Sequence, residues 1–431
     1  MVSDRKAAFI QAYRNLNLFP LSEANEIEQF QVKYGQKVLR TLHDAIIASE
    51  VNGKLIFTGH RGCGKSTLLV QLAGQMRNEG FYVARFSIAD MVEMSDVNHI
   101  NILYAIALKL LSQATKRQMP IAEGTKNALV NWFTQTKSRE YTDQLKQELI
   151  LGVDFYGLFS GKLQKEGAFR EIIRETYERR VSDLSEQINR IATTIQTTTG
   201  KEVLVIIDDL DKLDLDVVRP IFQDNIKALF SPGIRVIFTI PVAVIRDPRL
   251  VATLESDSRI IMLPVTKFYR REDVHKAHAT PIEANVATLE HLLEKRIPEE
   301  LIEPEMKRQI VLLSGGVLRE LVRLGQECCR ICMSEIDPDQ EDQRVKINAD
   351  ILQEAVKSLR NQFARTLGSN LFDLLKTTYE NLAPPNAKSS EFLDLLHSLY
   401  VLEYENDDLW YDLHPLVTDI LRRRQLLEPP L

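Results

Sequence analysis

The feature that most constrains this chain is a glycine-rich motif between a predicted strand and a predicted helix. Residues 59–66 read GHRGCGKS and fit the pattern G-x-x-x-x-G-K-[S/T]. The preceding run Lys54–Gly59 is short and apolar, as is typical of a buried strand, and an apolar helix start follows at Thr67. Glycines in such a loop let backbone N–H groups surround phosphate oxygens, and the helix N-terminus adds a favourable dipole. The motif therefore predicts a nucleotide-phosphate site.

The residues expected to line this site are Gly59, His60, Arg61, Gly62, Cys63, Gly64, Lys65, Ser66 and Thr67. Lys65 is expected to reach the β- and γ-phosphates, and the Ser66 hydroxyl to ligate Mg²⁺. His60 stands at a variable position of the pattern, so no role beyond lining the loop is predicted for it.

A second motif supplies carboxylates. The run 203–209 reads VLVIIDD, and its apolar part predicts a strand over Glu202–Ile207 that ends in two acids. In open α/β sheets, ligands bind at the carboxyl ends of the strands. Asp208 is therefore expected to hold Mg²⁺, and Asp209 to orient or deprotonate the attacking water. The alternative for Asp209 is that it only caps the next helix.

Further apolar runs predict strands over Tyr82–Ile88, Arg235–Ile240 and Arg259–Val265, with helices between them. This alternation favours an α/β fold with a parallel sheet and right-handed crossovers. The 431 residues carry a net charge of −6 and are 44% hydrophobic. This composition excludes a mainly disordered chain and a strongly basic nucleic-acid coat protein.

Four segments are expected along the chain: an N-terminal helical segment (1–50), the ATPase core (51–270), a helical lid (271–360) and a C-terminal domain (361–431). The core contains a helical insertion at about 96–198, where strand signals are almost absent. The C-terminal domain shows helices followed by two short strands, Leu399–Tyr404 and Leu409–Leu413. This is the order of a winged helix.

The two motifs, GHRGCGKST and VLVIIDDLD, resemble those of AAA+ and STAND P-loop ATPases, and within them the initiator branch related to origin-recognition ATPases. The resemblance implies ATP with Mg²⁺ as the cofactors. It implies that Thr239 is a polar sensor of the γ-phosphate or water, and that Arg319, after the Gly315-Gly316 turn, is a second sensor. It also implies that Arg259 is an arginine finger acting on a neighbouring subunit.

Simpler interpretations of these residues stay open. Arg319 could be a surface charge beside Arg323, and Arg259 an arginine at a strand edge. Arg270 and Arg271 are weaker candidates for the finger. The preference for ATP over GTP rests on the resemblance, because no Asn-Lys-x-Asp guanine motif follows the fourth strand.

The charge of the predicted winged helix argues against DNA binding. Residues 363–424 contain six basic and ten acidic side chains, and the presumed wing Glu403–Asp412 has five acids and no base. Affinity for duplex DNA comes largely from Lys and Arg on phosphates. We therefore expect this domain to contact protein.

The sequence thus predicts a slow, Mg²⁺-dependent ATPase that acts as a molecular switch, with a protein partner and with a homo-oligomer allowed. The alternatives are a DNA-binding initiator or transposition-type regulator, and a STAND-type signalling or defence ATPase. The longest apolar run is about ten residues, where a membrane span needs about 18 or more. The N-terminus carries no secretory-signal pattern. We expect a cytoplasmic protein without a membrane segment.

Overall fold

The computed structural model describes residues 4–21, 24–117, 132–135, 142–146, 155–336, 345–405 and 408–428. Contacts divide the chain into two compact units. We call Lys37–Thr58 with Leu69–Met262 the sheet unit, and Met1–Gln36 with Gly59–Leu68 and Leu263–Leu431 the helical unit. The phosphate loop belongs to the helical unit. Among the described residues, no helix is both long enough and apolar enough to cross a membrane.

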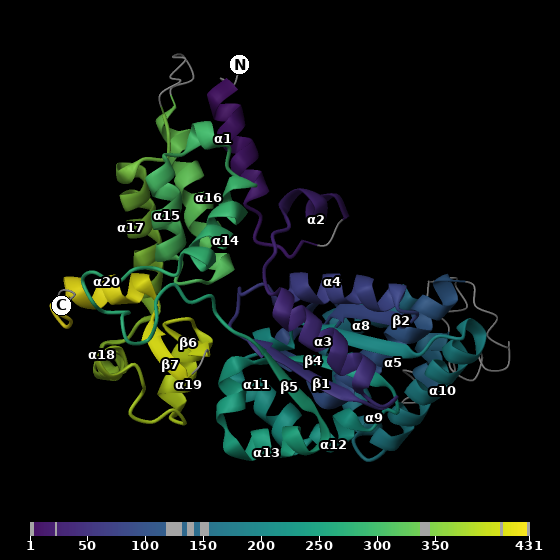
Figure 1. The fold of residues 1–431 in the computed structure, drawn as a ribbon. Coiled ribbons are helices and arrows are strands. Elements are labelled where there is room, and N and C mark those ends of the chain that lie inside the picture. Colours follow the sequence, from purple (N-terminus) through teal and green to yellow (C-terminus); the bar gives the residue numbers. More distant parts are fainter. Residues whose placement is uncertain are drawn as a thin grey trace. The chain divides into compact units, whose positions relative to one another are not determined.

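The sheet unit is built on a five-stranded parallel sheet in the order β2-β3-β4-β1-β5. Figure 1 shows the strands side by side, with helices packed around them. The strands are β1 (Lys54–Gly59), β2 (Tyr82–Ser87), β3 (Val203–Asp208), β4 (Arg235–Pro241) and β5 (Arg259–Leu263). β1, β3 and β4 are buried along their whole length, which explains their nearly unbroken apolar sequences. The predicted α/β fold is confirmed.

Helices cover this sheet and fill the predicted insertion wherever the insertion is described. They are α3 (Gln36–Ala48), α4 (Lys65–Asn78), α5 (His99–Lys116), α8 (Phe155–Lys165), α9 (Gly167–Tyr177), α10 (Val181–Thr199), α11 (Leu215–Arg219), α12 (Ile226–Phe230) and α13 (Pro248–Asp257). α5 begins where the Asn98 side chain accepts a hydrogen bond from the Asn101 N–H (3.0 Å). α5 contacts β2 and α10 contacts β3, so both ends of the insertion pack on the sheet. Residues 118–131, 136–141 and 147–154 of the insertion lie outside the described residues.

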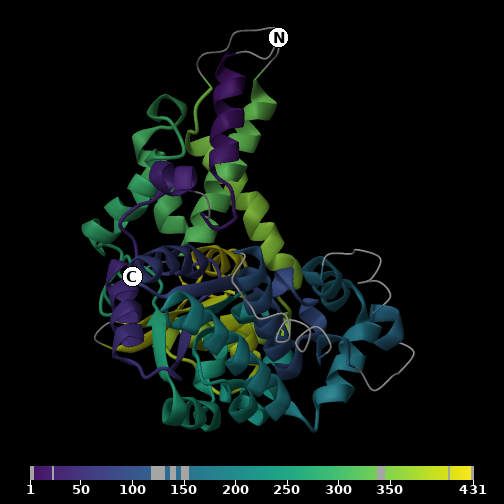
Figure 2. The same ribbon diagram turned by 90° about the vertical axis from the view of Figure 1, so that its right-hand side faces the viewer.

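The first part of the helical unit is a bundle that joins the N-terminal helix to the lid. Its helices are α1 (Asp4–Asn15), α2 (Ala24–Phe30), α14 (Glu283–Glu294), α15 (Pro304–Leu313), α16 (Leu318–Glu335) and α17 (Ala349–Thr366). In Figure 2, α1 (purple) lies along the green lid helices, and α1 contacts α16. The Arg5 guanidinium fixes this arrangement by donating to the Val345 carbonyl from both Nε (3.0 Å) and Nη2 (2.8 Å).

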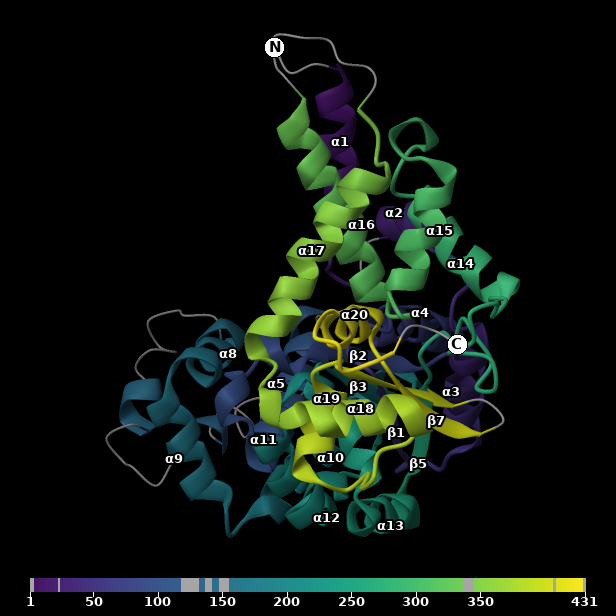
Figure 3. The ribbon, with the colours of Figure 1, turned by 90° about the vertical axis from the view of Figure 1, so that its left-hand side faces the viewer.

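The second part of the helical unit is a C-terminal group of three helices and a hairpin. Its elements are α18 (Phe372–Asn381), α19 (Ser390–His397), β6 (Val401–Glu405), β7 (Leu409–Leu413) and α20 (Pro415–Arg423). β6 and β7 pair antiparallel from Val401–Leu413 to Glu405–Leu409, as the sequence predicts. Residues 406–407 of the predicted turn lie outside the described residues. Figure 3 shows α20 beside α17, and the two helices are in contact.

Candidate functional site

The phosphate loop lies between β1 and α4, as predicted. Its glycines adopt backbone conformations that other residues rarely take: φ is +144° at Gly59, +80° at Gly62 and +92° at Gly64. A Cβ on Gly59 would stand 2.5 Å from the carbonyl oxygen of Leu263. Both the conformation and the close approach therefore require glycine at this position.

Lys65 is buried and folds back over the loop. Its ammonium donates to the carbonyl oxygens of Gly59 and His60, at 2.8 Å each. The motif assigns this ammonium to phosphate oxygens, but in this structure it is hydrogen-bonded to the two carbonyls. Binding of a nucleotide would therefore require Lys65 to exchange carbonyl partners for phosphate partners.

The start of α16 packs directly on the loop. The Arg319 N–H donates to the Gly62 carbonyl (3.0 Å), and a Cβ on Gly62 would stand 2.5 Å from the Arg319 Cβ. The Arg319 guanidinium is half-exposed, and it makes no hydrogen bond or ion pair with any residue that the structure describes. The predicted second sensor is thus next to the loop, with its charge available. Its role stays a prediction.

The hairpin also contacts the loop, through a residue to which the sequence assigns no chemistry. His60 is almost fully buried, and its Nε2 accepts a hydrogen bond from the Glu403 N–H at 2.9 Å. The ring therefore accepts at Nε2, as a neutral imidazole does. Nothing in the sequence near either residue signals this contact, because 343 positions separate them.

Tyr34 is a further neighbour of the loop that sequence reasoning misses. Its ring lies 3.6 Å from the position a Cβ would take on Gly64. Burial raises the pKa of its hydroxyl well above the ordinary value. Tyr34 lies two residues before α3, and the sequence motifs assign it no role.

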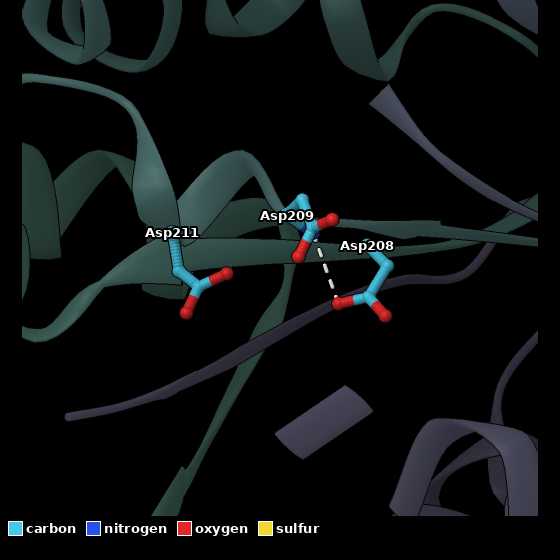
Figure 4. Close-up of side chains that lie close together, drawn as sticks. All are labelled: Asp208, Asp209 and Asp211. Atoms are coloured by element: carbon cyan, nitrogen blue, oxygen red, sulfur yellow. Dashed lines mark hydrogen bonds between the residues drawn. The ribbon is translucent and has the colours of Figure 1, made fainter. Parts of the chain in front are cut away.

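In the sheet unit, three carboxylates gather where β3 ends (Figure 4). Asp208, Asp209 and Asp211 each offer an oxygen, and these atoms lie within 4.8 Å of one another. The Asp209 N–H donates to Asp208 Oδ1 at 2.9 Å. The sequence predicts Asp208 and Asp209 here but misses Asp211, although it is the third acid of the run VIIDDLD.

Neighbouring side chains hold Asp209 in an uncommon backbone conformation. Its φ is +70°, which is unusual for a residue with a side chain. The Ser87 hydroxyl donates to Asp209 Oδ2 (2.6 Å), and the Lys212 ammonium pairs with Asp209 Oδ1 (2.5 Å). The predicted water-activating carboxylate is therefore occupied by two partners in this structure.

Thr239, the predicted polar sensor, is fully buried on β4 beside this cluster. Its hydroxyl accepts from the Leu210 N–H (3.0 Å) and donates to the Ile207 carbonyl (3.2 Å). It thus fixes the backbone on both sides of Asp208 and Asp209. Contact with a γ-phosphate stays a prediction.

The acid cluster fits a hard divalent cation. Carboxylate oxygens are the ligands that Mg²⁺ prefers. Asp208 is 3% exposed, and the Arg85 guanidinium pairs with it, with Nη1 at 3.7 Å from Oδ2. Asp208 is the carboxylate that the sequence assigns to the ion, and this assignment, like that of the Ser66 hydroxyl, stays a prediction.

Arg259 lies apart from the acid cluster. It is the exposed first residue of β5, so it stands at the amino end of its strand, whereas Asp208 stands at the carboxyl end of β3. In a parallel sheet the amino ends of all strands lie on one side and the carboxyl ends on the other, so these two residues stand at opposite ends of the strands. Arg259 makes no ion pair or hydrogen bond with any described residue, and a role on a neighbouring subunit stays a prediction.

Together, the parallel sheet, the glycine loop with its lysine, and the acids at the end of β3 define a P-loop NTPase. The profile of the KAP family P-loop domain matches residues 36–246, which include the loop, the acid cluster and Thr239. Comparison with curated proteins finds no match.

Among solved structures, a RuvB variant from Thermotoga maritima is 13% identical with a TM-score of 0.40, over 96% of this chain and 100% of that one. Cdc6p from Pyrobaculum aerophilum is 12% identical with a TM-score of 0.38, over 98% and 100%. PCH-2 from C. elegans is 12% identical with a TM-score of 0.32, over 82% and 73%. Such values are too low to transfer a function to this chain.

Proposed function

We propose that this chain is a Mg²⁺-dependent, ATP-binding and ATP-hydrolysing molecular switch. In this proposal, the nucleotide state of the phosphate loop sets the position of the lid and of the C-terminal group, and this controls assembly or the binding of a partner protein. The observation that carries the proposal is that two distant segments hold one short loop: α16 through Gly62, and β6 through His60.

The first step is the exchange at Lys65. To reach phosphate oxygens, its ammonium has to leave the carbonyls of Gly59 and His60. The loss of the Lys65 hydrogen bond would alter the environment of both the His60 backbone and its ring. The same residue accepts from Lys65 at its carbonyl and from Glu403 at its ring. Nucleotide binding would thus act directly on the contact with β6.

The second step is charge neutralisation. Bound Mg²⁺ would supply positive charge that neutralises oxygens of the β- and γ-phosphates and favours attack on the γ-phosphate. Ser66 and Asp208 would hold the ion, and the half-exposed Arg319 guanidinium would reach the γ-phosphate from the start of α16. An arginine placed there would move α16 with the phosphate it binds.

Hydrolysis is expected to be slow. Asp209 is one methylene shorter than the glutamate common in fast AAA+ motors, and Ser87 and Lys212 engage its carboxylate. A group that must first release two partners spends little time in a geometry that activates water. Slow turnover suits a switch, whose output depends on how long each nucleotide stays bound.

We propose that the C-terminal group binds a protein, and that this protein can be a second copy of the same chain. The excess of acids in residues 363–424 would repel duplex DNA. A DNA-loading initiator is the weaker alternative and predicts binding that falls steeply with salt. A STAND-type signalling ATPase would use the same switch with a trigger protein.

The direct test is titration of the purified chain with a fluorescent ATP analogue in Mg²⁺ and in EDTA. We expect saturable binding that Lys65→Ala abolishes and that Lys357→Ala, a change at an exposed lysine of α17, leaves intact. Phosphate release measured on the same samples gives the turnover. Equal affinity in wild type and Lys65→Ala would overturn the proposal.

A further inference from the structure

The helical unit contains a cavity of about 520 Å³ that lies apart from the phosphate loop. Its lining residues come from the lid helices α15 and α17, the hairpin, and α18 and α20. Leu313 and Leu352 line it from the lid, and Leu413 and Leu416 from the C-terminal group. Ligand cavities for small molecules commonly measure about 300–1,000 Å³.

Aromatic rings form the walls of this cavity in two stacked pairs. His275 lies on Tyr379 with ring centres 3.7 Å apart and an angle of 18° between the planes. Tyr404 lies on Trp410 at 4.5 Å and 22°. The Tyr404 hydroxyl donates to the Gly315 carbonyl (3.0 Å), which fixes the second pair. The cavity therefore presents flat, pre-oriented aromatic surfaces.

The acids of the lining already have cationic or N–H partners. Asp412 Oδ1 lies 3.1 Å from His275 Nε2 and accepts from the Leu413 N–H at 2.8 Å. Asp419 accepts from Arg360 (2.7 Å) and from Arg423 (3.0 Å). These carboxylates are thus satisfied and do not call for a cationic ligand.

Arg422, a lining cation, pairs with no carboxylate among the residues that the structure describes. Its Nη2 donates to the Tyr379 hydroxyl (3.0 Å), a neutral acceptor. Its Nε is inaccessible to solvent and has no hydrogen-bond acceptor in the part of the chain that the structure describes. A planar guanidinium with an unused, desolvated Nε–H favours a carboxylate or a phosphate.

We propose that this cavity binds a small aromatic anion, with its ring against the stacked pairs and its carboxylate or phosphate group on Arg422. This site goes beyond the proposed nucleotide switch and does not depend on it. It also touches the turn that precedes α16, since Gly315 lines the cavity. A ligand there would therefore contact the element that packs on the phosphate loop.

The test uses the fluorescence of Trp410. The chain has two tryptophans, and Trp132→Phe leaves Trp410, inside the cavity, as the single reporter. The probes are phenyl phosphate and phenylacetate, with benzyl alcohol as the neutral aromatic, and with inorganic phosphate and acetate as anions without a ring. We expect saturable changes with the two aromatic anions and at least about ten-fold weaker binding of the other three. Benzyl alcohol lacks the charged hydrogen-bond acceptor, and phosphate and acetate lack the ring surface that the cavity would bury.

Two variants locate the binding. Arg422→Gln is expected to weaken the binding of the aromatic anions by about 10- to 100-fold, because it removes the charge-assisted hydrogen bonds. Arg424→Gln, a matched change on the exposed arginine that lies over Phe372, is expected to leave affinity unchanged. Val356→Phe, which fills the cavity from α17, is expected to abolish binding and covers the case in which Arg422→Gln fails to fold. The ratio between phenyl phosphate and phenylacetate then identifies the anionic group.

Binding of benzyl alcohol as tight as that of phenyl phosphate would overturn the proposal, and so would unchanged affinity in both Arg422→Gln and Val356→Phe. A signal that disappears in Lys65→Ala would place the probe in the phosphate loop and would also overturn it. Failure of this site leaves ATP binding by the loop untouched, so the two proposals fail separately.

Discussion

Replacing His60 by phenylalanine tests how much the buried hydrogen bond from Glu403 to His60 contributes to holding the hairpin on the phosphate loop. Phenylalanine keeps a ring of similar size and removes the acceptor at Nε2. The Glu403 N–H, which now donates to that atom at 2.9 Å, would remain buried without an acceptor. An unsatisfied buried donor costs about 1–3 kcal/mol, which corresponds to a factor of about 5 to 150 in an equilibrium constant. We expect the docked state of the hairpin to be destabilised by this free energy relative to the released state.

Hydrogen exchange read by mass spectrometry measures the loss locally. In His60→Phe, protection of β6 amides should fall by about the same factor, while protection of β3 in the sheet unit should not change. His60→Gln is the matched control, because its amide oxygen can accept the same bond. If the docked hairpin opposes nucleotide binding, the apparent Kd for ATP should also fall in His60→Phe, by no more than this factor.

Unchanged protection of β6 in His60→Phe would refute this reasoning, because the bond would then contribute nothing to docking. A rise in exchange throughout both units would refute it as well, since the effect would be global unfolding. Recovery of protection in His60→Gln separates the lost acceptor from a change in packing.

Three further predictions concern the loop, the pH response and assembly. Gly62→Ala should lower the thermal midpoint of unfolding, because Gly62 has a φ of +80° and its new Cβ would meet the Arg319 Cβ at 2.5 Å. Gly74→Ala, within α4 and with nothing within 4 Å, should be neutral or should stabilise the chain by up to about 1 kcal/mol. Burial lowers the pKa of His414 to about 3 from 6.5, so its stabilising contribution is complete above pH 6.5 and is lost as the pH falls below it. That loss should reach about 2 kcal/mol at pH 5 in denaturant titrations and should be absent in His414→Asn. Arg259→Ala should weaken ATP-dependent assembly in mass photometry, and a monomer under all conditions in wild type would leave Arg259 a structural residue.

The sheet could be predicted from the sequence because buried parallel strands leave a local signal. β1 spans Lys54–Gly59, the same residues as the predicted run, and β4 extends only one residue beyond the prediction. β5 ends at Leu263 instead of Val265. Pro264 follows Leu263, and a proline cannot donate to a ladder. The ends of strands therefore depend on backbone hydrogen bonds, and these cannot be predicted from a run of hydrophobic residues.

The partners of these elements could not be predicted in the same way. α1 has an ordinary helical sequence, and nothing in it indicates that Arg5 will donate to the carbonyl of Val345. The same holds for His60 and Glu403. Contacts between residues hundreds of positions apart arise from packing complementarity, and one sequence contains no periodic pattern that identifies them.

Within the site, the motifs predicted which residues lie at the end of β3 but not the hydrogen bonds and ion pairs that these residues make. Asp208 and Asp209 stand at the end of β3 as expected, yet Asp209 is engaged by Ser87 and Lys212. Thr239 is beside them as expected, yet its hydroxyl bonds the backbone of Ile207 and Leu210. A motif specifies which groups nucleotide chemistry needs, whereas their partners in this structure depend on the rotamers and loop geometry around them.

The glycines of the loop link these observations. Phosphate binding needs glycine so that backbone N–H groups can face an anion. Packing in the helical unit needs the same glycines: a Cβ on Gly59 would meet Leu263, one on Gly62 would meet Arg319, and one on Gly64 would come within 3.0 Å of the Leu318 side chain. The loop that would take the phosphates is therefore also the loop against which the start of α16 packs. A ligand that moves this loop moves α16 by direct contact, so coupling between nucleotide and lid requires no relay through the rest of the fold.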